Sequence, residues 1–193
     1  MRWSVVHKLP FRAGILLILL FAILSCGCFW DSPAPRPAGT DGGLLWADAI
    51  ALPQAKSSLD TDALLVEAKG FSLMPDGRLP ANMGRWELRF ASYTKGNQIT
   101  ITVNEKGAVS RGPVVQSDAI FILGNPPGVF PDSMAAFMAT GGKGAAGPRT
   151  VRDPARLYYD KNRASYIWSI PLTVNNKNEV HLVRWDGIYI EME

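Results

Sequence analysis

The sequence predicts an α+β fold in which helices pack on an antiparallel sheet, and three observations support it. Residues 86–90 (Trp-Glu-Leu-Arg-Phe) alternate strictly between apolar and charged side chains, as a strand with one buried face does. Residues 99–103 repeat this alternation and lead into a turn at residues 104–107. Asp132 and Ser133 stand before the helix formers of residues 134–139, which is a helix N-cap signal.

The first half of the chain is expected to begin with a helix. Residues 44–56 combine apolar positions with helix-favouring alanines, and Pro53 is expected to kink or end that helix. Residues 63–73 are predicted to form a strand that leads to a turn at residues 75–77. Two strands follow, and a short return strand at residues 108–110 completes an antiparallel meander.

The second half is predicted to follow the same order. Residues 112–131 are irregular because they are rich in Pro and Gly, and the helix after Ser133 ends at Gly141. Three strands are then expected, at residues 156–159, 166–172 and 180–185. Asp186 and Gly187 are a strong hairpin signal, after which residues 188–190 close the chain.

An internal repeat suggests two tandem units. At an offset of 80 residues, Trp86, Leu88, Phe90, Val103 and Gly107 meet Tyr166, Trp168, Ile170, Val183 and Gly187. We therefore expect a first α+β unit at residues 44–112 and a second at residues 113–193. The alternative is one antiparallel sheet in which the spacing is a coincidence.

The N-terminus has the pattern of an export signal. Three basic residues precede 12 apolar residues at positions 13–24. As a helix, that run is about 18 Å long, which is too short to span a bilayer but typical of a signal peptide. Residues 1–25 are therefore interpreted as a signal peptide.

The residues that follow resemble a bacterial lipoprotein signal. The tetrapeptide Ile-Leu-Ser-Cys ends at Cys26, with an apolar residue three positions before the cysteine and a small residue just before it. Cys28, preceded by Gly27, is the alternative site. The resemblance implies a thioether-linked diacylglycerol on the cysteine and a location in the bacterial envelope, on the outer side of the cytoplasmic membrane or on the outer membrane. An ordinary cleaved signal and a short uncleaved anchor are the remaining alternatives.

Residues 26–43 are then expected to form a spacer between the lipid and the body, because prolines and glycines dominate residues 33–43. Without the leader, 17 Lys and Arg remain of the 20, against 17 Asp and Glu. No run of basic residues survives, so nucleic acid is not expected as a partner. Both cysteines lie at the end of the leader, so no disulfide is expected in the body.

The sequence offers little catalytic chemistry, and we expect neither an enzyme nor a cofactor. His181 is the only histidine after the leader, and no cysteine pair or His-Glu-x-x-His motif accompanies it, so no metal site is predicted. The glycine-rich residues 141–147 lack the Ser or Thr that follows the lysine of a phosphate-binding loop. A hydrolase with an unfamiliar site stays open only if carboxylates cluster near His181.

The order of features resembles bacterial PepSY-like domains. The resemblance is based on residues 86–90, the helix start at Asp132 and Ser133, Trp168, and the terminal hairpin at residues 183–187. The family's final strand often ends in an Asp-Ala pair before a Gly, and here Trp185-Asp186-Gly187 departs from that. The resemblance covers roughly residues 44–193. It implies a non-catalytic module that binds or restrains another envelope protein.

The predicted function is therefore that of a membrane-anchored, non-catalytic module that binds a protein or peptide. Trp185 beside Arg184 is a candidate recognition patch, although Trp185 packed over the sheet edge is the simpler interpretation. The alternative function is a carrier of a small apolar ligand or lipid. A concave apolar cavity favours the carrier, whereas a filled core with an exposed edge strand favours the partner-binding module.

Overall fold

The computed structural model describes residues 42–116, 126–141, 148–152 and 154–193. Within these residues the chain forms two helices, α2 (Leu44–Ser58) and α3 (Ser133–Gly141), and ten strands. The strands are β1 (Leu64–Phe71), β2 (Arg85–Ser92), β3 (Asn97–Asn104), β4 (Val109–Arg111), β5 (Val115–Gln116), β6 (Arg149–Val151), β7 (Ala155–Asp160), β8 (Ser165–Val174), β9 (Lys177–Arg184) and β10 (Tyr189–Met192). Neither described helix is both long and apolar enough to cross a bilayer.

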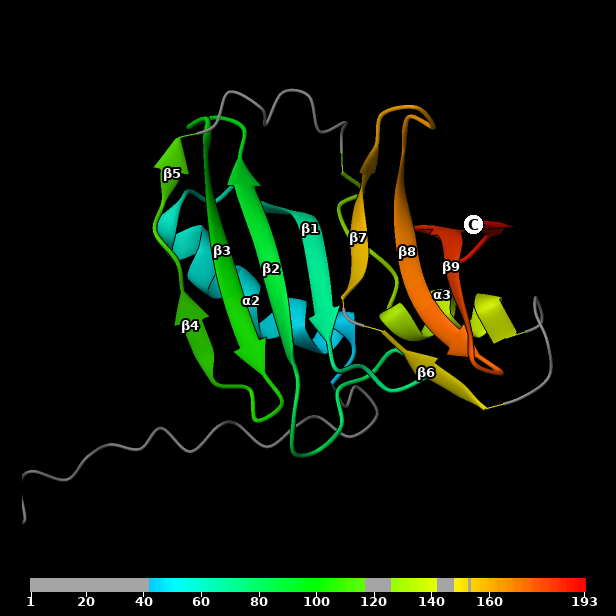
Figure 1. Ribbon diagram of the computed structural model, residues 1–193. Helices are drawn as coiled ribbons and strands as arrows, with labels where there is room; N and C mark the ends of the chain where they lie inside the picture. The colour runs from blue at the N-terminus through cyan, green and yellow to red at the C-terminus, as the bar shows by residue number, and fades with distance from the viewer. Residues whose placement is uncertain (1–41, 117–125, 142–147, 153) are drawn as a thin grey trace, which may run out of the picture. The chain divides into compact units, whose positions relative to one another are not determined.

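All ten strands belong to one antiparallel sheet (Figure 1). Its main order is β10-β9-β8-β7-β1-β2-β3-β4, while β5 pairs with β3 and β6 pairs with β8. The two meanders meet at the centre, where β1 pairs with β2 on one side and with β7 on the other. In the β1–β7 pair, Ala68 lies opposite Leu157 and Gly70 lies opposite Ala155.

This arrangement corrects the predicted fold class. The α+β fold of two tandem PepSY-like units is wrong: the described chain is mostly antiparallel sheet, and a helix-on-sheet PepSY-like arrangement is not evident. The sheet runs without a break from the strands of the first half to those of the second. Alternation of side chains shows that a segment is a strand, but it does not show which strand pairs along its second edge. The β1–β7 pair was therefore invisible in the sequence.

The strands of the two halves do correspond at the offset of 80 residues, but inside this single sheet. β2 starts at Arg85 and β8 at Ser165, while β3 and β9 have the bounds Asn97–Asn104 and Lys177–Arg184. The hairpin predicted at Asp186 and Gly187 is confirmed, with the Arg184 amide donating to the Ile188 carbonyl at 2.7 Å. Gly187 has a φ of +85°, a conformation that glycine adopts without strain.

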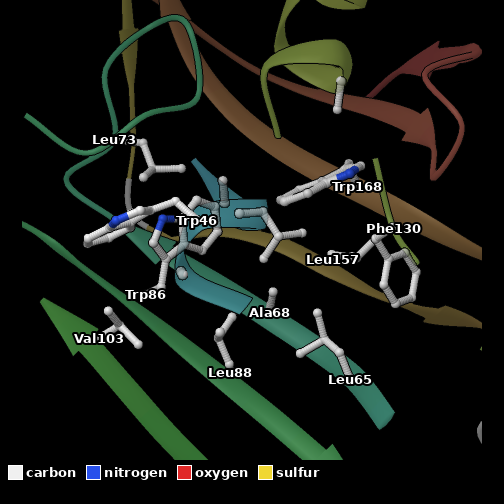
Figure 2. Close-up of a cluster of buried hydrophobic side chains, with 14 of the residues drawn as sticks. Trp46, Leu65, Ala68, Leu73, Trp86, Leu88, Val103, Phe130, Leu157 and Trp168 are labelled. Carbon is white, nitrogen blue, oxygen red and sulfur yellow. The ribbon is translucent and has the colours of Figure 1, made fainter. Parts of the chain in front are cut away.

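The core lies between the helices and one face of the sheet, and two tryptophans stand at its centre (Figure 2). Trp86 from β2 and Trp168 from β8 are in edge-to-face contact, with ring centroids 6.2 Å apart. Trp86 is fully buried, and its indole N–H donates to the Gly42 carbonyl at 2.9 Å. Leu157 of β7 belongs to the same hydrophobic cluster, so the core is continuous across the junction of the two halves.

Each helix covers its own part of the sheet. α2 packs on β1, β2 and β3, and α3 packs on β9 and β10. α2 continues to Ser58, past Pro53, so of the two outcomes predicted for Pro53, a kink or an end, the end is wrong. Pro53 is exposed, and the predicted N-cap residues of α3 also cap α2. Ser133 Oγ accepts the Leu44 amide at 3.1 Å, and Asp132 Oδ1 accepts the Leu45 amide at 3.3 Å.

Candidate functional site

The predicted recognition residues Arg184 and Trp185 lie where β9 ends. Arg184 is the last residue of β9, and Trp185 begins the turn that follows it. The Arg184 guanidinium is bound to the Asp186 carboxylate, to which it donates two hydrogen bonds of 2.8 and 2.6 Å. Trp185 is half-buried and packs against the core. The predicted lipidation sites, Cys26 and Cys28, lie outside the described residues.

Trp185 lines an aromatic cleft at one end of the sheet. The cleft has a volume of about 400 Å³, and its walls are Pro126, Pro127, Tyr159, Ala164, Ser165, Tyr166 and Trp185. The ring centroids of Tyr159 and Tyr166 are 5.4 Å apart, and those of Phe130 and Tyr166 are 5.1 Å apart. Pro126 and Phe130 are buried, so the chain's own residues already pack over much of this aromatic surface.

His181 lies between a carboxylate and a phenol. Its Nε2 is 3.2 Å from Glu179 Oε2, and its Nδ1 is 3.3 Å from the hydroxyl oxygen of Tyr189. The imidazole is only 1% exposed, so a substrate has no route to it. Burial, with the nearby charges of Glu179 and Glu191, raises the pKa of Tyr189, so its hydroxyl stays protonated at neutral pH.

The arrangement around His181 therefore supports a structural role. One carboxylate, that of Glu179, contacts the ring. The bond from Tyr189 joins the last strand, β10, to the neighbouring strand β9. We call this Tyr189–His181 contact the latch at His181. No motif in the sequence predicts it, because Tyr189 follows His181 only after a hairpin.

A buried carboxylate, that of Glu67, forms ion pairs at the centre of the sheet. The Glu67 side chain on β1 is 8% exposed, and its carboxylate contacts Arg89 at 2.6 Å, Arg156 at 2.9 Å and Lys69 at 3.7 Å. Burial alone raises the pKa of Glu67, but the Arg156 hydrogen bond and the three positive charges outweigh it, so the pKa lies below its ordinary value. This network joins β1 to β2 and β7, and three of its members, Glu67, Lys69 and Arg89, line a small hollow of about 100 Å³.

The outer strand β10 has the character of a binding surface. We call residues 188–193 the β10 edge. β10 stands at one end of the strand order, so its outer backbone groups have no ladder partner among the described residues. Three large apolar side chains are exposed along it: Ile188 at 53%, Ile190 at 36% and Met192 at 52%. An open edge with exposed apolar side chains is a template for an added strand.

The opposite end of the sheet has a similar surface, which we call the β4–β5 edge and define as residues 109–116. β4 and β5 both pair with β3 on their inner side. Val109, Val114 and Val115 are exposed at 38%, 46% and 43%. The sequence predicted a return strand at 108–110 and a closing strand at 188–190, but it did not predict that both would be sheet edges.

Between helices and sheet, the structure is filled. The large side chains of the core are packed against one another, and those at its centre are less than 2% exposed. The two clefts described above have charged or aromatic walls and lie at the surface. In the described part of the chain, no group of three His, Cys, Asp or Glu side chains is arranged to hold a metal ion.

Comparisons with known proteins identify no relative of this chain. No protein-family model matches the chain, and no curated protein or solved structure matches it either. The function is therefore inferred from the geometry and the sequence signals together.

Proposed function

We propose that the protein is a lipid-anchored protein of the bacterial envelope that binds an extended segment of a protein or peptide partner along its β10 edge. The observation that carries this proposal is that the outer backbone groups of β10 have no ladder partner among the described residues and lie beside three exposed apolar side chains. A partner strand gains main-chain hydrogen bonds there, and its alternate side chains meet Ile188, Ile190 and Met192.

The latch at His181 supports this role for β10. A binding edge has to stay in place while it is unoccupied, and a four-residue strand has few ladder bonds of its own. The Tyr189–His181 bond and the T-shaped contact of their rings, 5.9 Å apart, tie the strand to β9. The paired Glu193 and Val180 backbones, at 2.8 and 3.0 Å, extend the ladder to the end of the chain.

The filled core favours partner binding over the carrier of a small apolar ligand. A carrier needs an apolar cavity of several hundred cubic ångströms. The space between α2 and the sheet is instead occupied by side chains such as Trp46, Trp86 and Leu88 (Figure 2).

The anchor is tested by the intact mass of the chain expressed in a bacterial host, with Cys26→Ala and Cys28→Ala beside it. The proposal predicts a diacylglycerol-sized mass gain that Cys26→Ala abolishes and Cys28→Ala leaves unchanged. A chain without lipid contradicts the anchor, and a gain lost only in Cys28→Ala moves the site to that cysteine.

The binding edge is tested by photo-cross-linking in the intact envelope. A benzophenone amino acid at Ile190 is expected to form an adduct with another polypeptide. The same probe at Met83, which is 54% exposed and lies in the loop before β2, serves as the control. Equal labelling from both positions, or none from Ile190, contradicts the proposal.

A further inference from the structure

The two edges of the sheet are complementary to each other. Of the nine large apolar side chains that are exposed in the described chain, six lie on them: Val109, Val114, Val115, Ile188, Ile190 and Met192. Among the described residues, each edge therefore combines backbone groups that have no ladder partner with three exposed apolar side chains. Such surfaces are costly to leave uncovered, because they invite pairing with another chain.

The charges of the two edges are opposite. The β10 edge has two acidic residues, Glu191 and Glu193, and no basic one. Glu191 already pairs with Arg163, so Glu193 supplies the negative charge that is available to a partner. The β4–β5 edge has one charged residue, Arg111, and Lys106 precedes it in the turn before β4. Arg111, Lys106 and Glu193 are exposed, and none has an ion-pair partner among the described residues. Two β10 edges or two β4–β5 edges repel each other or gain no electrostatic attraction, whereas a β10 edge and a β4–β5 edge attract each other.

We propose that the β10 edge of one copy pairs with the β4–β5 edge of a second copy, so that the sheet continues from molecule to molecule. This inference rests on the proposed function and names the partner as a second copy of the chain. The contact is heterologous, so each copy still has one free edge after pairing, and rows of several copies form.

The short edges explain why the contact depends on the membrane. β4 has three residues and β5 has two, so one contact makes few ladder bonds. Copies held on one membrane by their lipids meet at a raised effective concentration, which compensates for a weak contact. Rows are therefore expected on the membrane rather than in dilute solution.

The body of the chain has no cysteine after Cys28, which allows a clean test. Full-length chains that carry Cys28→Ala and either Ile190→Cys or Val115→Cys are expressed alone or together, and their envelopes are treated with a short bismaleimide linker. We expect no dimer above the wild-type background from either variant alone, and a dimer when both are present. The double variant is expected to give a ladder of higher species.

A matched control replaces Val115→Cys by Met83→Cys, which is exposed and lies in the loop before β2, outside both edges, and no dimer is expected with Ile190→Cys. Arg111→Glu is expected to reduce the mixed dimer at least several-fold, and adding Glu193→Lys to the other copy is expected to restore part of it. A dimer from Ile190→Cys alone overturns the inference, because it shows that like edges pair.

The test separates this inference from the proposed function. If no dimer forms but the benzophenone at Ile190 captures a different protein, the inference that a second copy is the partner is wrong. The proposed function then stands, because the β10 edge binds another polypeptide. If neither dimer nor adduct forms, both the inference and the proposed function are overturned.

Discussion

Ser133 Oγ lies 3.1 Å from the Leu44 amide nitrogen, 89 residues away in the sequence, and accepts its hydrogen bond. The same hydroxyl donates to the Gly77 carbonyl at 2.8 Å. One fully buried side chain thus starts α3, caps α2 and fixes the loop before β2. The space is tight: a Cβ on Gly43 would lie 2.3 Å from Asp132 Oδ1, so the Asp132 side chain would have to move to admit one.

Ser133→Ala is expected to lower the free energy of unfolding by about 1 to 3 kcal/mol, because it leaves a buried amide and a buried carbonyl without a partner. The loss is measured by urea unfolding. Ser57→Ala is the control, since its exposed hydroxyl only contacts the Gln54 carbonyl; its effect is expected to stay within about 0.5 kcal/mol. Equal losses in both variants contradict the bridging role.

Tyr189→Phe is expected to loosen the β10 edge without unfolding the body. The variant keeps the ring contact with His181 but removes the hydroxyl, at a cost of about 1 kcal/mol. Hydrogen exchange of the amides in residues 188–193 is expected to become several-fold faster. Tyr159→Phe, in the aromatic cleft, should leave those amides unchanged. Unchanged exchange in Tyr189→Phe would mean that the hydroxyl is no latch.

Glu67→Gln is expected to destabilise the protein near neutral pH and to matter less in acid. The pKa of Glu67 is lowered from its ordinary 4.5, so its stabilising contribution is complete above that value and disappears as the pH falls through the folded pKa. We expect a loss of about 2 kcal/mol near neutral pH. The loss is measured by urea unfolding of the wild type and the variant from neutral pH into the acid range. If the difference in their free energies of unfolding does not depend on pH, the Glu67 ion pairs are not its cause.

Asp48→Asn is expected to have the opposite pH dependence. Burial in α2 raises the pKa of Asp48 to about 6, against the weaker opposing charge of Lys56. The raised pKa means that the wild type is less stable when Asp48 is ionised, above the folded pKa, and gains stability as the pH falls from there toward 3.8. At about pH 8 the variant should be more stable by roughly 1 to 2 kcal/mol.

The matched control for this experiment is Asp62→Asn. Hydrogen bonds from Ser92 and Thr94 outweigh the effect of burial and lower the pKa of Asp62, so its replacement should cost stability at the same pH. Thermal or urea unfolding of the three proteins gives the signs. If Asp48→Asn is destabilising at alkaline pH, the Asp48 carboxylate has partners that the structure does not account for.

The local structure of the chain could largely be predicted from its sequence. The alternation at residues 86–90 and 99–103 identified β2 and β3, the Asp132-Ser133 signal identified the start of α3, and Asp186-Gly187 identified the last hairpin. These signals are local, because they depend on the residue period, the cap and the turn. Pro53 does not end α2 as one alternative expected, because it lies exposed in the helix and packing of the opposite helix face maintains the helix.

The arrangement of the strands could not be predicted in this way. β1 is a central strand with buried residues on both faces, so its sequence shows no clean alternation, and nothing in it indicates β7 as a neighbour. The β10 and β4–β5 edges are consequences of that pairing. The latch at His181 likewise depends on Tyr189 returning across a hairpin, which brings together two residues that carry no joint motif.

The central claim is that the β10 edge is covered in the envelope and uncovered in the purified protein. In a chain that carries Cys28→Ala, Ile190→Cys supplies the only thiol after Cys26, and its reaction rate with a maleimide is compared between envelope membranes and purified protein. The account predicts at least a tenfold slower reaction in the membranes, while Met83→Cys reacts equally fast in both. Equal rates for Ile190→Cys would contradict the account, because a bound partner has to shield this position.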